Sequence, residues 1–434
     1  MCVMKIIYLI TGSGGSFYCG NCYRDMIYVR AIRKVPGISA SAIPLYLPPD
    51  EINTDGGFDR HVFFGAISLY LREKVPFLRN MPAAFDKILD SAPMLRMAAR
   101  RSGTTNTEGL EDMTISMIKG EKAFPEKELF RLIKYIEENG KPDIIHLSNA
   151  LIIGLARQLK KHMDVRIVCS LLNEDDWIDD MAEPYRSDAW RLIAGEAENV
   201  DMFITPSNYY RETFIHKTGY QGNNIAVVPL AVDNTGVNAM PVKDNFPALG
   251  YFSRLNAHNG FDKIVDVFIY LKEKKMLPGL TLHVSGGYTG SDKRFLSAQI
   301  KKIRSAGLED SFTLYPGFHG AGKEEFFSNI DIMSVPVRKQ DGYGLYILEA
   351  NLFGVPVVQP HTGAFPEIIE KTAGGLTYTP DSTVAFAESL VSLFSDGDLR
   401  RKMGVNGREN VLREFSLEKM AEGLSSVYLR AREK

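Results

Sequence analysis

The sequence predicts an α/β protein built from two doubly wound domains, each with a parallel sheet covered by helices on both faces. Short apolar runs alternate with longer segments of helical period, which is typical of βαβ units. The alternation pauses over residues 233–247, which are rich in Asn, Asp, Gly and Pro, and then resumes. The chain has 434 residues, too many for one core of roughly 100 to 200 residues.

The first half of the chain contains apolar runs typical of buried strands. They are KIIYLI, AIPLYL, DIIHLS, RIVCSLL, MFITPS and AVVPL, with helix-like stretches between most of them. We therefore expect residues 1–235 to form one Rossmann-like domain, on the acceptor side of the ligand site. Residues 66–125 contain no clear strand pattern and predict a helical insertion in this domain.

The predicted insertion is amphipathic and positively charged. Seven cations occur between Arg72 and Arg101, against three anions. Such a segment can touch a membrane surface or an anionic lipid acceptor, or it can form helices that cover the acceptor side of the site. Charge surpluses are common on protein surfaces, which favours the second interpretation.

The second half repeats the pattern with the runs ALGYFSR, TLHVSG, SFTLYPG, IDIMSVPV, PVVQP and GLTYT. We expect residues 236–415 to form a second Rossmann-like domain. Residues 416–434 are helical by period, and packing back on the first domain is one option for this C-terminal helix. Ligands of doubly wound sheets bind beyond the carboxyl ends of the strands, so we expect the site between the two domains.

The composition excludes several classes of protein. A net charge of −2 and a pI near 6.5 do not favour nucleic-acid binding. The apolar runs fall short of the roughly 18 residues that a membrane span needs, and the opening stretch predicts no export signal. Four cysteines are too few for a disulfide scaffold, which is typical of the cytoplasm.

The segment DGYGLYILEANLFGVPVVQPHTGAFPEIIE, residues 341–370, carries the most chemical information. Glu349 lies within an apolar helix, where its carboxylate needs hydrogen bonds from a cation or from ligand hydroxyls. Gly342 and Gly344 precede this helix, and a helix N-terminus suits a phosphate. Together with Asp341, these features indicate a nucleotide-sugar site. Taken singly, Glu349 can also be a salt-bridged core residue and Asp341 a helix N-cap.

This segment resembles the signature of the retaining GT-B glycosyltransferases of glycosyltransferase family 4, in which two acidic residues lie eight apart. Asp341 and Glu349 take those positions, followed by GVPVV at 354–358 and by Gly363 and Glu367. The stretches YFSRLNAHNGFD, LHVSGG and LEDSFTLYPGFH are similar to further motifs of that family, and PDIIHLSNA and MFITPSNYYRETF are similar to its first-domain strand ends.

The resemblance implies a GT-B fold and transfer of a sugar, with retention of configuration, from a nucleoside diphosphate sugar to a carbohydrate, lipid-linked or small-molecule acceptor. It implies no metal and no other cofactor. Asp341 and Arg254 would be catalytic, with Arg254 neutralising the leaving diphosphate, and Glu349 would bind the ribose. The other expected donor-binding residues are Gly342, Tyr343, Gly344, Leu345, Tyr346, Asn259, Gly286, Gly287, Gly317 and Phe318.

The sequence departs from the family pattern at several positions. Asp341 stands where glutamate is usual, which shortens its reach to the sugar. Asn259 stands where lysine is usual, which removes a cation from the diphosphate; Lys263 and His258 are candidates to replace it. Leu172 stands where histidine is frequent. The polar acceptor-side candidates after that strand are Asn173, Glu174 and Asp175.

The stretch GSGGSFYCGNCYRD, residues 12–25, fits a phosphate loop, half of a metal site or a redox dithiol. No second CxxC or CxxH completes a zinc site, and the chain is too large for a thioredoxin fold. We therefore expect Gly14, Gly15 and Ser16 to form a backbone turn on the acceptor side. Cys19 and Cys22 then fall in the first turn of a helix, where a thiol can make activity oxidant-sensitive.

Two other functions remain compatible with the sequence. One is a GT-B protein that binds nucleotide sugars with weak or no transfer, which Asn259 and Leu172 motivate. The other is nucleotide-sugar epimerisation, which needs a catalytic acid pair or histidine that the signature does not supply. The leading hypothesis is a cytoplasmic glycosyltransferase, with peripheral contact at the inner face of the membrane as an option.

Overall fold

The computed structural model describes residues 3–11, 17–18, 20–46, 107, 109–120, 126–235, 237 and 247–434. The chain divides into two compact units. Unit 1 comprises Met1–Gly15, Asn21–Pro229 and Met420–Lys434, and unit 2 comprises Ser16–Gly20 and Leu230–Lys419. Most of the predicted linker at 233–247, and the charged part of the predicted insertion at 66–125, lie outside the described residues.

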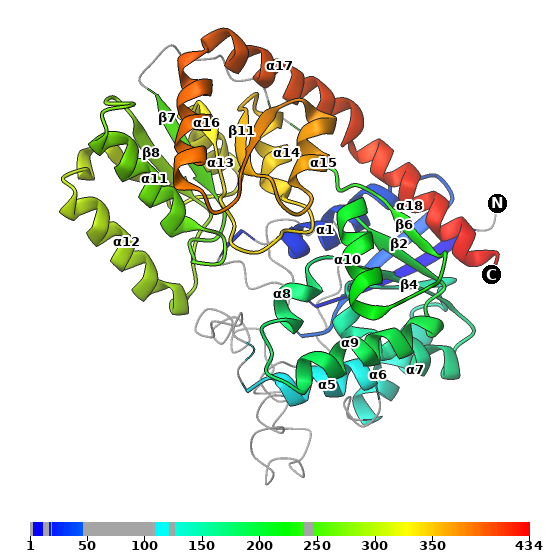
Figure 1. Cartoon of the computed structure of the whole chain (residues 1–434). Helices are drawn as coiled ribbons and strands as arrows, with labels where there is room; N and C mark the ends of the chain where they lie inside the picture. The colour runs from blue at the N-terminus through cyan, green and yellow to red at the C-terminus, as the bar shows by residue number, and fades with distance from the viewer. Residues whose placement is uncertain are drawn as a thin grey trace. The chain divides into compact units, whose positions relative to one another are not determined.

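Unit 1 contains a parallel sheet, three of whose strands, β2, β4 and β6, are labelled in Figure 1. Within the described residues the strand order is β2-β1-β3-β4-β5-β6. Its strands are β1 (Met4–Ile10), β2 (Ile38–Pro44), β3 (Ile144–Leu147), β4 (Arg166–Ser170), β5 (Met202–Thr205) and β6 (Ile225–Val227). The order reverses between β1 and β3. In a doubly wound sheet, that reversal marks the place where ligands bind beyond the strand ends.

The helices of unit 1 lie between these strands in the chain. They are α1 (Gly20–Ile32), α5 (Glu111–Lys119), α6 (Glu126–Glu138), η3 (Ala150–Ile152), α7 (Leu155–His162), α8 (Glu174–Ile178), α9 (Tyr185–Glu196), η4 (Ala197–Asn199), α10 (Asn208–Thr218) and the C-terminal α18 (Leu417–Arg432). Helix α5 falls inside the predicted helical insertion. Helix α10 has typical caps, with Ser207 accepting from the Tyr210 N–H and Gly219 in the left-handed region.

Unit 2 contains a second parallel sheet in the order β12-β11-β10-β7-β8-β9, counted over the described residues. Its strands are β7 (Ala248–Phe252), β8 (Thr281–Ser285), β9 (Phe312–Leu314), β10 (Ile332–Met333), β11 (Val357–Pro360) and β12 (Gly375–Tyr378). The reversal lies between β7 and β10, so the segments that follow these two strands form the expected ligand-binding edge.

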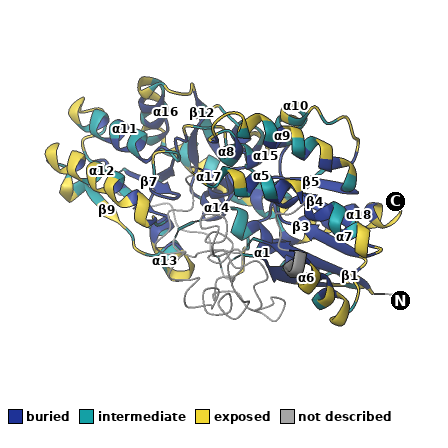
Figure 2. Cartoon of the chain, turned by 90° about the horizontal axis from the view of Figure 1, so that it is seen from below, coloured by how far each residue is buried: buried dark blue, intermediate teal, exposed yellow. Residues whose placement is uncertain are grey.

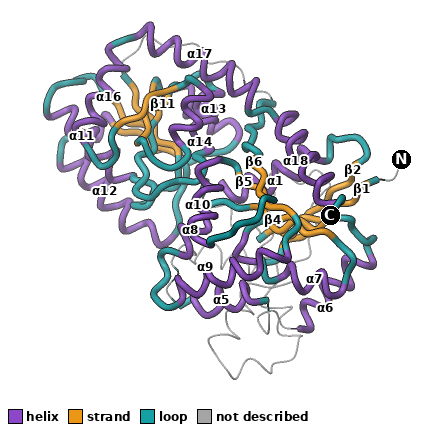
Figure 3. The backbone as a smooth tube through the Cα atoms, turned by 45° about the vertical axis from the view of Figure 1, so that its right-hand side comes forward, coloured by secondary structure: helices purple, strands orange, loops and turns teal. Residues whose placement is uncertain are grey.

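The helices of unit 2 surround this sheet. They are α11 (Phe261–Glu273), η5 (Gly290–Asp292), α12 (Lys293–Ser305), η6 (Glu309–Ser311), α13 (Gly320–Ser328), α14 (Leu345–Leu352), α15 (Phe365–Thr372), α16 (Thr383–Ser395) and α17 (Gly397–Glu414). Figure 3 shows the strands of each unit at its centre with helices outside them.

The strands are continuous apolar runs because helices cover both faces of each sheet. Every residue of β3, β5 and β7 is buried, and Figure 2 shows the strands as buried while outer helix faces are exposed. These observations confirm the predicted doubly wound architecture. None of the helices in the described ranges has both the length and the apolar character needed to cross a membrane.

Helix α18 is held in unit 1 by a buried chain of hydrogen bonds. The Tyr428 hydroxyl lies 2.5 Å from the Tyr8 hydroxyl and 2.7 Å from His146 Nδ1, and His146 Nε2 lies 2.7 Å from Ser170 Oγ. Burial lowers the pKa of His146 to about 3, so the imidazole is neutral. These hydrogen bonds join the C-terminal helix α18 to β1, β3 and the end of β4.

Candidate functional site

Glu349 is the most informative residue of unit 2. Helix α14 is buried along its whole length, and Glu349 is only 3% exposed. Lys323 Nζ, from α13, donates to Glu349 Oε1 at 3.0 Å. No donor in the described part of the chain reaches Glu349 Oε2, which is buried. A buried carboxylate oxygen without a donor is costly, so this atom suits a ligand hydroxyl.

Asp341 lies on the segment between β10 and α14, half-buried. Its Oδ1 accepts from the Tyr343 N–H and its Oδ2 accepts from the Tyr346 hydroxyl, both at 3.0 Å. Asp341 is therefore oriented by Tyr343, which precedes α14, and by Tyr346 in the first turn of that helix. Tyr343 itself is anchored, because its hydroxyl donates to the Leu230 carbonyl at 2.7 Å.

The glycines before α14 are required by the backbone. Gly344 is the N-cap of α14 with φ of +79°, and a Cβ at this position would lie 2.6 Å from the Phe365 ring. The predicted donor-binding residues Gly342 and Leu345 are buried on either side of it. This turn begins α14, whose Ile347 N–H donates to the Gly344 carbonyl at 2.9 Å.

Arg254 follows β7, at the other strand of the reversal, and it is buried in an ion pair. Its Nε donates to Asp292 Oδ2 at 2.8 Å, and its Nη2 donates to Asp292 Oδ1 at 3.1 Å and to Thr289 Oγ1 at 2.9 Å. The guanidinium is thus fixed, and its charge is balanced by Asp292. The capping box between Thr289 and Asp292 signals a helix start but not this partnership.

Asn259 forms hydrogen bonds that hold the segment after β7. Its side-chain amide donates to Ser253 Oγ at 2.8 Å, and its carbonyl accepts from the Tyr251 hydroxyl at 3.2 Å. The residue that replaces the family's usual lysine thus braces the turn that carries Arg254. The suggested replacement cation Lys263 pairs with Asp381 at 2.6 Å.

Gly317 and Phe318, two of the predicted donor-binding residues, follow β9. The Gly317 carbonyl accepts from Ser285 Oγ at 2.9 Å, which joins the ends of β9 and β8. The Phe318 ring packs against His319, with the centroids 4.3 Å apart. This segment leads into α13, the helix that carries Lys323, so it connects these predicted donor-binding residues with the partner of Glu349.

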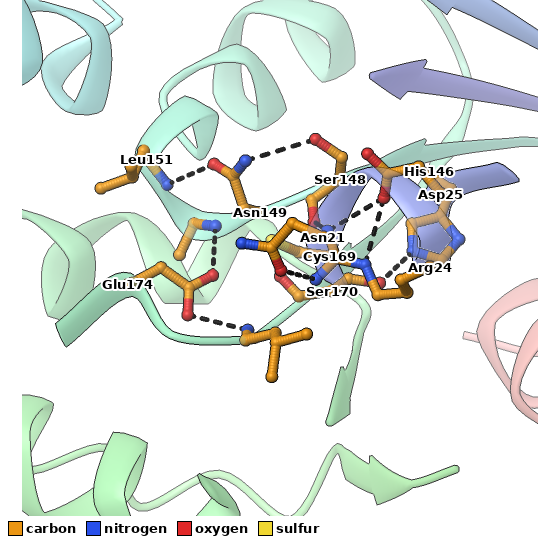
Figure 4. Close-up of polar contacts among 12 residues, drawn as sticks. Asn21, Arg24, Asp25, His146, Ser148, Asn149, Leu151, Cys169, Ser170 and Glu174 are labelled. Atoms are coloured by element: carbon orange, nitrogen blue, oxygen red, sulfur yellow. Dashed lines mark hydrogen bonds and ion pairs between the residues drawn. The ribbon is translucent and has the colours of Figure 1, made fainter. Parts of the chain in front are cut away.

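Unit 1 contains a second polar cluster, around the buried Arg24 of α1 (Figure 4). Arg24 Nε and Nη2 donate to Asp25 Oδ1 at 3.1 and 2.9 Å, Nη2 also donates to the Ser148 carbonyl, and Nη1 donates to Asn21 Oδ1 at 3.4 Å. Burial raises the pKa of Asp25 to about 6, and the bonded guanidinium limits the rise. No pattern in the sequence indicated this cluster, which ties α1 to the end of β3.

The acceptor-side candidates after β4 have different surroundings. Glu174 is buried and accepts from the Ala150 and Leu172 N–H groups at 3.0 and 2.9 Å, and from the Tyr210 hydroxyl at 2.6 Å. It therefore braces the segments after β3 and β4. The backbone of Asn173 is in the left-handed helical region, with φ of 57°.

Asp175 is half-buried in the first turn of α8. Its pKa is raised to about 7, first by burial and then by the neighbouring charge of Asp176. Among the acceptor-side candidates it is the carboxyl suited to hold or accept a proton near neutral pH. Gly14, Gly15, Ser16 and Cys19 lie outside the described residues, and Cys22 is half-buried in the first turn of α1.

Two family profiles match adjoining parts of the chain. The family described as "Glycosyl transferases group 1" matches residues 237–410, and "Glycosyltransferase Family 4" matches residues 118–235. The lipopolysaccharide core biosynthesis mannosyltransferase LpsB of Rhizobium meliloti is 30% identical over 42% of this chain and 50% of its own. The capsular polysaccharide biosynthesis glycosyltransferase CapM of Staphylococcus aureus is 26% identical over 54% and 60%. The matched part thus spans about half the length of these curated relatives.

Solved structures share the architecture across nearly the whole chain. Sucrose-phosphate synthase from Thermosynechococcus elongatus matches with a TM-score of 0.71 and 16% identity over 98% of both chains. HepE of Anabaena, in complex with UDP, matches with a TM-score of 0.67 and 14% identity over 98% of this chain and 100% of its own. This likeness shows that the chain has the GT-B fold, and the two adjoining family matches show that it belongs to the group 1, family 4 glycosyltransferases.

Proposed function

We propose that this protein transfers a sugar from a nucleoside diphosphate sugar to an acceptor hydroxyl, with retention of anomeric configuration. The observation that carries the proposal is the orphaned Glu349 Oε2 inside a buried helix. In this proposal the ribose hydroxyls donate to that oxygen, while Asp341 accepts from a hydroxyl of the sugar. The phosphates then lie between the two acids, near the N-terminus of α14.

The reaction needs stabilisation of the leaving diphosphate. Negative charge builds on the phosphates as the bond to the sugar breaks, and fixed donors stabilise that charge without reorganising. In unit 2 the candidates are the N–H groups that begin α14 and the guanidinium of Arg254, at the two strands where the sheet order reverses. These groups provide the stabilisation in our proposal, which requires no metal.

The names of similar proteins support a hexose donor and a glycan acceptor. HepE of Anabaena has been solved with UDP-glucose, and LpsB and CapM are named for lipopolysaccharide core and capsular polysaccharide biosynthesis. We therefore propose a nucleoside diphosphate hexose as donor and a carbohydrate or lipid-linked acceptor. We further propose a cytoplasmic location, at the inner face of the membrane when the acceptor is lipid-linked.

The first test is the Glu349→Gln variant. It keeps the shape of the side chain but removes the charge, and hydrogen bonds to charged groups contribute about 1.5–3 kcal/mol. We expect affinity for the preferred nucleoside diphosphate, found by screening UDP, GDP and ADP, to fall at least about tenfold by calorimetry. Glu324→Gln, at an exposed position of the neighbouring α13, is the matched control.

Two results would contradict the proposal. One is wild-type affinity in the Glu349→Gln variant. The other is the absence of any sugar transfer, by mass spectrometry, from UDP-, GDP- or ADP-hexoses to saccharide and polyprenyl-phosphate saccharide acceptors. A product with inverted anomeric configuration, identified by NMR, would contradict the retaining mechanism alone.

A further inference from the structure

Two aromatic residues from the glycine-rich stretch near the N-terminus, Phe17 and Tyr18, belong to unit 2. Phe17 forms an antiparallel β-bridge with Gly287, and the Tyr18 N–H donates to the Gly286 carbonyl at 2.8 Å. The Tyr18 ring packs edge-on against Phe252, with the centroids 5.0 Å apart. Backbone and side chain together hold this dipeptide against the turn that follows β8.

The turn accepts the dipeptide because it is made of glycines. Gly286 has φ of +122°, and a Cβ there would lie 2.2 Å from the Ser253 carbonyl oxygen. Gly287 has φ of +72°, and its carbonyl accepts from the Leu255 N–H at 2.9 Å. The predicted donor-binding glycines therefore connect three segments: the dipeptide, the end of β8 and the residues around Arg254.

The Arg254 guanidinium lies over the Phe17 ring, with its central carbon 4.6 Å from the ring centroid. Arg254 is 4% exposed, and Asp292 and Thr289 engage its Nε and Nη2 atoms. Within the described residues, no acceptor bonds Nη1. The ring contact and the acceptors on two nitrogens thus fix the guanidinium and leave Nη1 for another anion.

We propose that Phe17 is a positioning residue of the donor site, which holds Arg254 so that its Nη1 edge bonds the distal phosphate of a nucleoside diphosphate sugar. This inference rests on the proposed function and deepens it. Stacking on an aromatic face leaves the N–H groups at the edges of a guanidinium available. Because Asn259 replaces the usual lysine, correct placement of Arg254 matters more in this chain.

The test compares Phe17→Leu with Phe17→Trp. Leucine keeps apolar contact but lacks a π face, whereas tryptophan restores the face. Calorimetric titrations use UDP, GDP and ADP and the matching monophosphates. We expect Phe17→Leu to weaken binding of the preferred diphosphate about three- to thirtyfold and binding of the monophosphate less than about twofold. Phe17→Trp is expected to bind the diphosphate within about threefold of the wild type. Phe130→Leu, at an exposed site of unit 1, is the control.

Three results would overturn the inference. Unchanged diphosphate affinity in Phe17→Leu would show that the ring does not act on Arg254. Equal losses for diphosphate and monophosphate, without recovery in Phe17→Trp, would show a purely structural role. A wild-type protein that binds none of the three diphosphates would overturn the proposed function and this inference with it, whereas the first two results leave the proposed function standing.

Discussion

At the scale of single residues, both charges expected to hold the donor are buried and already paired. Lys323 takes one oxygen of Glu349, and Asp292 takes two nitrogens of Arg254. A buried charge without a partner is costly, so each pair stabilises its residue before any ligand binds. Each pair also leaves one atom for a ligand, Oε2 of Glu349 and Nη1 of Arg254. The donor then meets groups whose positions are set in advance.

The Lys323→Met variant tests whether Lys323 stabilises the buried charge of Glu349. Removing one member of a buried pair leaves an unpaired charge, and we expect the free energy of unfolding to fall by about 2–4 kcal/mol, measured by urea denaturation. The double variant Lys323→Met/Glu349→Gln removes both charges, so it is expected to recover at least about half of that loss. It should still bind nucleotide poorly, because Glu349 is gone.

A matched control is Lys302→Met, which breaks the exposed pair with Asp266 and is expected to change stability by less than about 1 kcal/mol. Full wild-type stability in the Lys323→Met single variant would contradict the claim that Lys323 stabilises the buried charge of Glu349.

At the scale of elements, the sequence predicted the strands and α14 but not the partners of their charged residues. Apart from β2, the strands of the described residues fall, to within one residue, inside apolar runs read from the sequence, because a buried parallel strand needs a local run of apolar residues. Strand β2 (Ile38–Pro44) begins four residues before the run AIPLYL, because its first part, ISAS, alternates with serine and is not a continuous apolar run. The need of Glu349 for hydrogen bonds from a cation or from ligand hydroxyls was also predicted, since a carboxylate inside an apolar helix requires donors, and Lys323 is such a cation.

The identity of that cation was not predictable from the sequence. Lys323 comes from a separate helix, and Asp292 pairs with Arg254 across 38 positions of sequence. Tyr428 meets His146 across 282 positions. These pairings depend on how segments after different strands meet, which no local pattern encodes. The polar cluster around Arg24 was missed for the same reason.

Helix α8 begins with three consecutive acidic residues, and their proximity predicts that the stability of the protein depends on pH. Asp175 lies beside Glu174, Asp176 and the Tyr210 hydroxyl, and its pKa is raised to about 7. A raised carboxyl pKa in the folded state gives stability that is fully present below the unfolded pKa of 3.8 and is lost as the pH rises through about 7. Wild-type protein should therefore lose stability over this range.

Asp175→Asn removes this titration. We expect equal stability of variant and wild type near pH 4, and an advantage of about 1–2 kcal/mol for the variant near pH 8, from urea denaturation at both pH values. Asp164→Asn, at an exposed site of unit 1, should follow the wild type at both pH values. Parallel stability curves for wild type and Asp175→Asn would show that Asp175 is ionised in the folded protein throughout.

At the scale of the whole molecule, each unit includes a short segment from the far end of the chain: unit 2 includes Ser16–Gly20, and unit 1 includes Met420–Lys434. The donor-side residues described here all fall within unit 2, including Phe17 from the N-terminal part of the chain, whereas α18 from the C-terminal end belongs mostly to unit 1. The repeated strand-and-helix pattern predicted two domains. Packing of the C-terminal helix on the first domain was one option read from the sequence, but nothing in the pattern indicated that Phe17 belongs to unit 2, because that placement depends on single contacts such as the bridge of Phe17 with Gly287.

Because the proposed donor residues all belong to unit 2, we expect bound nucleotide to stabilise unit 2 more than unit 1. A ligand stabilises the unit that binds it by RT ln(1 + [L]/Kd), about 2.7 kcal/mol at 100 times Kd. We expect the preferred nucleoside diphosphate to slow amide hydrogen exchange in unit 2 by up to about a hundredfold, most strongly in α14 and around residues 253–260. Exchange in β3, β4 and α8 of unit 1 should change much less, because the proposed donor contacts lie outside them. The Glu349→Gln variant, at the same nucleotide concentration, should show little slowing in either unit. Slowing confined to unit 1 would place the nucleotide on the other sheet and contradict the assignment of the donor site to Asp341, Glu349 and Arg254.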